Sequence, residues 1–284
     1  MKTYFHYSMI LFQLIVFANC DTKKRYSDDV FLNLTCYTLS MCNNSQPSQI
    51  GMIGDSWKDI IVGYPLIETL RIQLEKNHGY QITGATLAGQ TLEAALTTGL
   101  QYQVIDQAGA NLRVIILSLG GNDIQANLKD YTTNLESTRS ARFNSIKINL
   151  KRLIQTGNAY KTAKFGGEPL KWIIHGYDYS NPNMPAVESV SNEGCNARFI
   201  SAGFNSSSVI EFSSTQLNAY NELLRSILSE EPSLYYVDLR QTLGGPPISQ
   251  ADLMFDCIHP NNLGFQLLGN RLSTLISPIT GLKP

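Results

Sequence analysis

The chain has 284 residues, of which 43% are apolar and 16% are charged, and its formal net charge is −1. This composition is typical of a folded globular protein and excludes a disordered chain or a multi-span membrane protein. The nearly balanced charge gives no electrostatic reason to expect nucleic acid or an acidic membrane as a partner. The length suits one large α/β domain or two small domains.

The N-terminal residues 1–19 have the pattern of an export signal. Lys2 supplies the positive start, an apolar stretch runs from Met9 to Ala18, and "VFA" provides a cleavage site. The apolar stretch is shorter than the about 20 residues that a membrane-spanning helix needs. We therefore expect an exported protein that is secreted, periplasmic or held at a membrane as a lipoprotein.

Cys20 adds an alternative to simple secretion. The tetrapeptide "FANC" resembles the lipobox of bacterial lipoproteins, in which the cysteine is lipidated and becomes the new N-terminus. Phe17 and Asn19 depart from the small-residue pattern of that motif, so a lipid anchor at Cys20 stays an open alternative. Residues 20–48 form a polar leader ahead of the domain predicted at residues 49–284.

The four other cysteines are Cys36, Cys42, Cys195 and Cys257. An even number of cysteines in an exported chain suggests two disulfides. Cys36 and Cys42 are near enough in sequence to close a small loop, which would pair Cys195 with Cys257. The spacing of the cysteines fits no common zinc pattern.

Five apolar runs are candidate strands, and several are continuous rather than alternating. They are Gln49–Gly54, Tyr80–Thr83, Arg113–Leu119, Lys171–His175 and Leu234–Leu239. Continuous runs of Ile, Val and Leu are expected of parallel strands that are covered on both faces. Helical patterns lie between and after these runs, so the sequence predicts a doubly wound α/β sheet.

The predicted helices are amphipathic stretches with recognisable ends. One runs from Pro65, at a first-turn position, to a stop at Gly79, and another covers residues 145–157 and stops at Gly157. A third begins with Ser214 as a candidate N-cap. A fourth closes the chain over residues 262–276.

The segment 179–208 is the least regular part of the domain and is rich in Asn, Ser and Gly. It follows a predicted strand, which is where a lid or a pocket wall would be placed. A surface excursion without function is the alternative.

Candidate functional residues follow the strands, because ligands of open α/β sheets bind beyond the carboxyl ends of the strands. Asp55 and Ser56 follow the first strand, and Gly84 follows the second. "GGND" at residues 120–123 follows the third strand, and "HGYDY" at residues 175–179 follows the fourth.

A nucleophilic serine needs a base, and histidine is the usual one. His259 lies in "FDCIHPNNLGF", where Asp256 is near enough to orient its ring and Pro260 restricts its backbone. His175 has a similar spacing to Asp178, but it directly follows an apolar strand, where a buried structural histidine is equally expected. We favour His259 over His175.

An ester-cleaving serine also needs hydrogen-bond donors for the oxyanion that forms on the substrate. The backbone N–H of Gly84 and the side-chain amide of Asn122 follow neighbouring strands and would serve. Each is a weak signal by itself, because either can belong to an ordinary turn.

The combination of motifs is more specific. Gly-Asp-Ser, a strand-end glycine, Gly-Gly-Asn-Asp and Asp-x-x-His-Pro occur in this order, with strand–helix spacing between them. In this the sequence resembles the SGNH (GDSL-type) hydrolase family, over about residues 49–276. The resemblance implies a flavodoxin-like three-layer α/β/α sandwich with a central, mostly parallel sheet.

The resemblance also implies a role for each motif residue. Ser56 would be the nucleophile, His259 the general base and Asp256 the residue that orients it. The oxyanion hole would comprise the backbone N–H groups of Ser56 and Gly84 and the side chain of Asn122. No metal or organic cofactor is called for.

We therefore expect an exported serine esterase that hydrolyses small-molecule, lipid or glycan esters through an acyl-enzyme. A carbohydrate O-acetyl esterase and a lysophospholipase are alternatives within the family, and a non-catalytic binding protein is an alternative outside it. Trp57 stands where the motif commonly has leucine. With Tyr177 and Tyr179 it is expected either to shape specificity or to fill the core.

Overall fold

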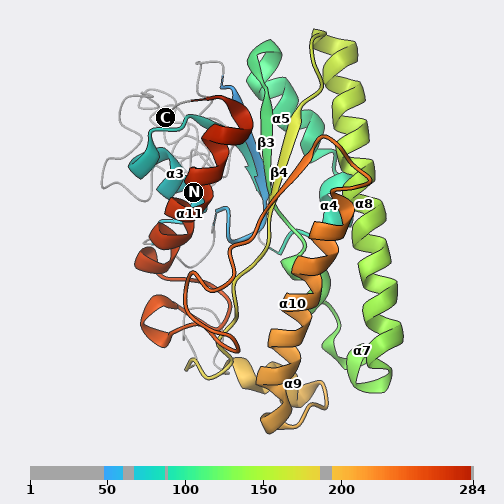
Figure 1. Ribbon diagram of the computed structural model, residues 1–284. Helices are drawn as coiled ribbons and strands as arrows, with labels where there is room; N and C mark the ends of the chain where they lie inside the picture. The colour runs from blue at the N-terminus through green and yellow to red at the C-terminus, as the bar shows by residue number, and fades with distance from the viewer. Residues whose placement is uncertain (1–47, 60–66, 87–88, 186–193, 283–284) are drawn as a thin grey trace, which may run out of the picture. The chain divides into compact units, whose positions relative to one another are not determined.

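Five parallel strands form the centre of the computed structural model, which describes residues 48–59, 67–86, 89–185 and 194–282 (Figure 1). The sheet order is β2-β1-β3-β4-β5, and each neighbouring pair is parallel. The strands are β1 (Ile50–Gly54), β2 (Ile82–Thr86), β3 (Val114–Ser118), β4 (Lys171–His175) and β5 (Leu234–Val237). All residues of β1 and β3 are buried, as the continuous apolar runs predict.

Helices cover both faces of this sheet. They are α3 (Leu70–His78), α4 (Leu92–Thr97), α5 (Leu100–Ala108), α6 (Gly121–Gln125), α7 (Leu128–Thr133), α8 (Leu135–Phe165), α9 (Cys195–Ser201), α10 (Val209–Ile227) and α11 (Asn262–Thr280). Short 3₁₀ turns lie at η2 (Gly109–Asn111), η3 (Ser206–Ser208) and η4 (Ala251–Leu253). Helices α3 and α11 pack together on one face, while α4, α5, α8 and α10 lie on the other (Figure 1).

This arrangement confirms the predicted three-layer α/β/α sandwich. The order β2-β1-β3-β4-β5 is that of the flavodoxin-like class, in which the strand order reverses beside the first strand. The carboxyl ends of β1 and β3 therefore meet at the edge of the sheet where a ligand is expected.

Several local predictions are confirmed as well. Gly79 ends α3 in the left-handed conformation, with φ of 69°. Cys195 and Cys257 form a disulfide. The export signal, the polar leader up to residue 47, the Cys36–Cys42 pair and Pro65 lie outside the described residues. Within the described ranges, no helix is long and apolar enough to span a membrane.

Two predicted helix ends are wrong. Helix α8 continues through Gly157 to Phe165, and a Cβ on Gly157 would lie 2.6 Å from Cζ2 of Trp172. Gly157 therefore does not end the helix; its missing side chain leaves room for the ring of Trp172. Helix α10 begins at Val209, so Ser214 is inside it and is not its N-cap.

The predicted end of β2 is also wrong, and this changes the position of Gly84. The strand extends to Thr86, which places Gly84 inside it, opposite Met52 of β1. A Cβ on Gly84 would lie 2.7 Å from Cε of the buried Lys58. The glycine therefore makes room for the Lys58 side chain and does not lie at the end of the strand.

Candidate active site

Ser56 lies in a tight turn directly after β1. The N–H of Asp55 donates to the carbonyl oxygen of Ser118 at 2.9 Å, which extends the pairing of β1 with β3 by one residue. A Cβ on Gly54 would lie 2.6 Å from Cβ of Lys58 and 2.8 Å from Cβ of Ser118, so only glycine fits there. This close approach lets the chain turn at once and leaves Ser56 half-buried at the carboxyl edge of the sheet.

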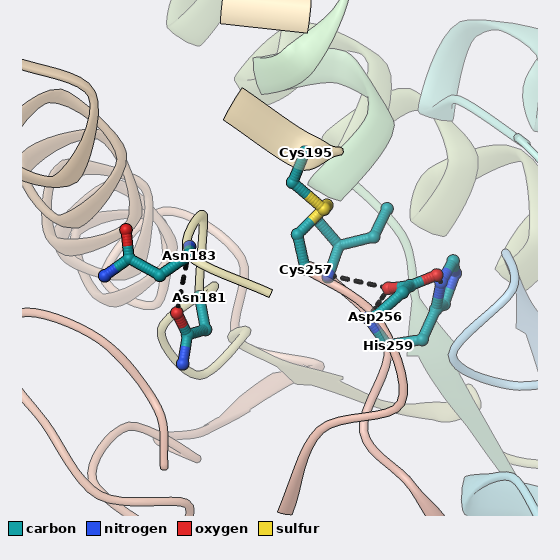
Figure 2. Close-up of a disulfide and its surroundings, with 7 residues drawn as sticks. Asn181, Asn183, Cys195, Asp256, Cys257 and His259 are labelled. Carbon is teal, nitrogen blue, oxygen red and sulfur yellow. Dashed lines mark hydrogen bonds and ion pairs between the residues drawn. A yellow bond between two sulfur atoms is a disulfide. The ribbon is translucent and has the colours of Figure 1, made fainter. Parts of the chain in front are cut away.

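Asp256 and His259 lie in a loop that is fixed by its own hydrogen bonds. Asp256 Oδ1 accepts the backbone N–H groups of Ile258 at 2.8 Å and His259 at 2.7 Å (Figure 2). The carbonyl of His259 accepts the N–H of Phe255 at 2.8 Å. The other carboxylate oxygen of Asp256, Oδ2, is 2.7 Å from His259 Nδ1. Asp256 therefore holds both the backbone and the ring of His259.

His259 reaches Ser56 with the opposite side of its ring. Its Nε2 lies 2.7 Å from Ser56 Oγ, although 203 positions separate the two residues. Burial acts against ionisation of Asp256, but the hydrogen bond and charge of His259 hold the pKa of this carboxyl below its usual value. The three side chains thus form a continuous chain of hydrogen bonds that ends on an ionised carboxylate.

His175, the alternative base, is directed into the core. It is fully buried, its Nδ1 lies 2.9 Å from the carbonyl oxygen of Gly176, and its Nε2 has no hydrogen-bond partner among the described residues. Burial lowers its pKa to about 4. Asp178, which the spacing offered as its partner, accepts the N–H groups of Gln241 and Leu243 instead. The geometry therefore favours His259.

Asn122 lies beside Ser56 on the wall of a pocket of about 380 Å³, at the start of α6. Its Nδ2 is 3.1 Å from the carbonyl oxygen of Gln90 and 3.4 Å from Asp55 Oδ2. Gly84 is not among the residues that line this pocket. Asn122 is thus placed where the sequence predicted it, and Gly84 is not.

A second glycine of the same segment, Gly89, directly precedes a residue that contacts Asn122. Gly89 follows the end of β2, is exposed, and has φ of 74°. It directly precedes Gln90, whose carbonyl oxygen accepts from the Asn122 side chain. Only Gly84 was predicted from the sequence, because the strand is longer than its apolar run and Gly84 directly follows that run.

Asp55 is a buried residue whose carboxyl group lies at the wall of the pocket beside Ser56. It accepts the backbone N–H of Trp57 at 3.0 Å and the hydroxyl of Tyr177 at 2.5 Å. Burial raises the pKa of Asp55 to about 6, although the Tyr177 hydrogen bond acts in the opposite direction. The sequence places Asp55 in the turn but gives no sign of its contact with Tyr177, because the two residues are 122 positions apart and only the folded sheet brings them together.

Trp57 is buried and connects the turn that carries Ser56 to the loop that carries His259. Its indole N–H donates to the carbonyl oxygen of Ile258 at 2.8 Å. Its ring meets Tyr177 and Phe265 edge to face, at centroid distances of 4.9 and 5.9 Å. The core-filling interpretation of Trp57 is therefore confirmed, and the ring also lines the pocket beside Ser56.

Within the part of the chain that the structure describes, no group of three or more His, Cys, Asp or Glu side chains could hold a metal ion. Residues 56–267 match the GDSL-like Lipase/Acylhydrolase family. The chain belongs to this family. It is therefore an ester-bond hydrolase, and the alternative of a non-catalytic binding protein is set aside. No curated protein gives a match to the sequence.

Two solved structures illustrate the shared fold. A lipase, Lip_vut3 from a goat rumen metagenome, is 16% identical, with a TM-score of 0.53 over 80% of this chain and 96% of its own. The acetylxylan esterase Axe2 of Geobacillus stearothermophilus is 13% identical, with a TM-score of 0.50 over 85% of this chain and 97% of its own. At such identities the likeness concerns the fold.

Proposed function

We propose that the chain is an exported serine esterase that hydrolyses carboxylic esters by a Ser56–His259–Asp256 triad through an acyl-enzyme. One observation carries the proposal: His259 lies 2.7 Å from Ser56 Oγ through Nε2 and 2.7 Å from Asp256 Oδ2 through Nδ1. These are the distances at which a base can take the serine proton while a carboxylate holds its tautomer.

Acylation begins when Ser56 Oγ attacks the ester carbonyl carbon. The hydroxyl proton passes to Nε2 of His259, and Asp256 stabilises the imidazolium that forms. The tetrahedral intermediate then collapses, the bond to the alcohol oxygen breaks, and the alcohol leaves with the proton from Nε2. Ser56 is left as an ester of the acyl group.

The oxyanion needs donors in the pocket beside Ser56. The backbone N–H of Ser56 and the Nδ2 group of Asn122 are two of them. Since the 3.4 Å contact of Nδ2 with Asp55 is long, that N–H can turn to a substrate oxygen. We assign the third donor to the backbone N–H of Gly89 in place of Gly84, because Gly89 lies in the loop next to Asn122.

Deacylation repeats these steps with water. A water molecule takes the place of the alcohol, loses a proton to Nε2 of His259 and attacks the acyl carbon. The acid then leaves, and the proton returns to Ser56 Oγ. Every proton transfer uses the same nitrogen of His259, so the Asp256 contact to Nδ1 is kept throughout.

Export is supported by residues 1–19 and by the Cys195–Cys257 disulfide, since disulfides persist in oxidising compartments. A lipid anchor at Cys20 stays an alternative to simple cleavage. The mass of the mature N-terminal peptide from the native host tests both, because a lipidated Cys20 adds acyl mass that a cleaved signal does not.

The catalytic assignment is tested with a serine-reactive phosphonate and a panel of aryl esters. Wild type and the exposed control Ser226→Ala should hydrolyse the esters and bind one phosphonate per chain. Ser56→Ala should do neither. Labelling that persists in Ser56→Ala contradicts the assignment. Release of acetate alone from the panel and from acetylated glycans would identify an O-acetyl esterase.

A further inference from the structure

A second, apolar cavity adjoins the pocket beside Ser56. Its walls surround about 430 Å³ of space, part of which is open to solvent. Its lining residues are Ile124, Gln125, Leu128, Ser180, Pro182, Phe199, Phe212, Ser213, Gln216, Leu217, Cys257 and Ile258. Four of them, Gln125, Ser180, Leu217 and Ile258, also line the pocket beside Ser56, so the two spaces share a wall.

The lining suits a hydrocarbon and no charged group. None of the described lining residues carries a charge, and the aromatic rings of Phe199 and Phe212 meet edge to face, with their centroids 6.2 Å apart. The Ser213 hydroxyl is buried and has no hydrogen-bond partner among the described residues. The side-chain nitrogen of Gln216 is likewise buried without such a partner, so the lining offers two polar atoms and is otherwise mostly apolar.

The cavity extends away from Ser56 along α10. Leu217 lines both spaces, whereas Ser213, one helical turn earlier, lines only the second. One turn is about 5.4 Å. Gln125 and Leu128 show the same order on the opposite wall, since Gln125 lines both spaces and Leu128 only the second. An acyl chain on Ser56 would pass Leu217 first and Ser213 next.

A covalent bond ties one wall of the cavity to the catalytic loop. Cys257 lies between Asp256 and His259 in the chain and is bonded to Cys195, the first residue of α9 (Figure 2). Helix α9 carries Phe199 into the cavity. The backbone N–H of Asn181 also donates to the carbonyl oxygen of Cys257 at 2.8 Å. The described parts of segment 179–208 thus form part of the cavity wall, which is one of the roles that the sequence predicted for the segment.

We infer that this cavity binds the acyl chain of the substrate and that the enzyme prefers esters of medium-chain fatty acids to acetyl esters. The inference rests on the proposed acyl-enzyme at Ser56. It is carried by the mostly apolar lining of the cavity and by its position beside the pocket that holds Ser56. Acetyl esters would leave the cavity unused.

The test is kcat/KM for p-nitrophenyl acetate, butyrate, octanoate and laurate, each below its micellar concentration. Each methylene that leaves water contributes a factor of about four. We expect octanoate to exceed acetate by at least about 100-fold, because some methylenes stay partly exposed. A profile that is flat or falls with chain length overturns the inference.

A variant that fills the cavity supplies the second test. Ser213→Leu adds a side chain beyond the shared wall and should lower the octanoate-to-acetate ratio of kcat/KM by at least about tenfold, the loss of two methylene contributions. Thr215→Leu makes a similar change on the exposed side of the same helix and should keep the wild-type ratio. Equal ratios in the two variants contradict the inference.

A third measurement uses wild type alone, so it stands even where Ser213→Leu does not fold. An octylphosphonate should inactivate wild type faster than a methylphosphonate by a factor similar to that of the esters. The measurements distinguish failure of the esterase proposal from failure of the acyl-chain inference. Wild type without any ester hydrolysis or labelling contradicts the esterase proposal, whereas hydrolysis and labelling without a chain-length preference contradict only the acyl-chain inference.

Discussion

The substitution Trp57→Phe separates the hydrogen bond of Trp57 from its packing. Phenylalanine keeps an aromatic ring against Tyr177 and Phe265 but removes the indole N–H that donates to the carbonyl oxygen of Ile258. Ile258 directly precedes His259. We therefore expect the catalytic loop to lose one of the contacts that hold the base against Ser56.

The size of the effect follows from the number of remaining contacts. Leaving the partly buried carbonyl of Ile258 without its donor costs about 1–3 kcal/mol of unfolding free energy. The loop keeps the Cys195–Cys257 disulfide, the Asn181 hydrogen bond and the backbone contacts of Asp256. Since only part of the restraint is lost, we expect kcat to fall by about 5- to 30-fold, equivalent to 1–2 kcal/mol. KM for a short ester should change little.

The assay combines urea unfolding with kcat and KM for an aryl acetate. Trp172→Phe is the matched control, because the buried Trp172 donates its indole N–H to Asn158 Oδ1 at 2.9 Å and lies in β4, outside the pocket beside Ser56. It should lose similar stability and keep its kcat. Equal losses of kcat in both variants, or an unchanged kcat in Trp57→Phe, would refute a positioning role for Trp57.

Three further predictions concern the base, its alternative and the disulfide. His259→Gln should lower kcat by at least about 1,000-fold, whereas His175→Gln should keep most activity, as measured with the same ester; the opposite result reassigns the base. Burial lowers the pKa of His175 from 6.5 to about 4. As the pH falls, His175 is therefore protonated in the unfolded chain before it is protonated in the folded one. The free energy of unfolding should fall by on the order of 3 kcal/mol between pH 6.5 and about pH 4. Protonation of Asp55 acts in the opposite direction over part of this range, because the pKa of Asp55 is raised to about 6 and its protonation stabilises the folded chain. The measurement is therefore the difference in the urea-derived free energy of unfolding between wild type and His175→Gln. A difference that does not vary with pH contradicts the predicted effect of His175. Replacing Cys195 and Cys257 by serine removes a link across 62 positions and should lower the free energy of unfolding by up to about 4 kcal/mol. Activity on octanoate should fall more than activity on acetate. Equal losses on both esters would show that the disulfide does not support the acyl cavity.

Much of the fold could be read from local patterns. All five strands were predicted, because parallel strands that are covered on both faces need continuous apolar runs. Such runs can be recognised in the amino-acid sequence alone. The errors lie where a glycine or serine was interpreted by its local preference. Gly157 and Gly84 are each required by a side chain from elsewhere in the chain, Trp172 and Lys58. No local pattern contains that information.

The site shows the same division. The sequence by itself determined which residue types stand beside the strand ends, and these predicted a site of Ser56, His259 and Asp256, because their order limits which side chains can meet. The neighbours along the chain already favoured His259 over His175, and the tertiary structure supports this choice, since the ring of His259 reaches Ser56 whereas that of His175 is buried in the core. Only the tertiary structure decided the position of Gly89, the contact of Trp57 with Ile258 and the apolar cavity behind Ser56. Each of these depends on side chains that are far apart in sequence and adjacent only once the sheet and its helices have packed.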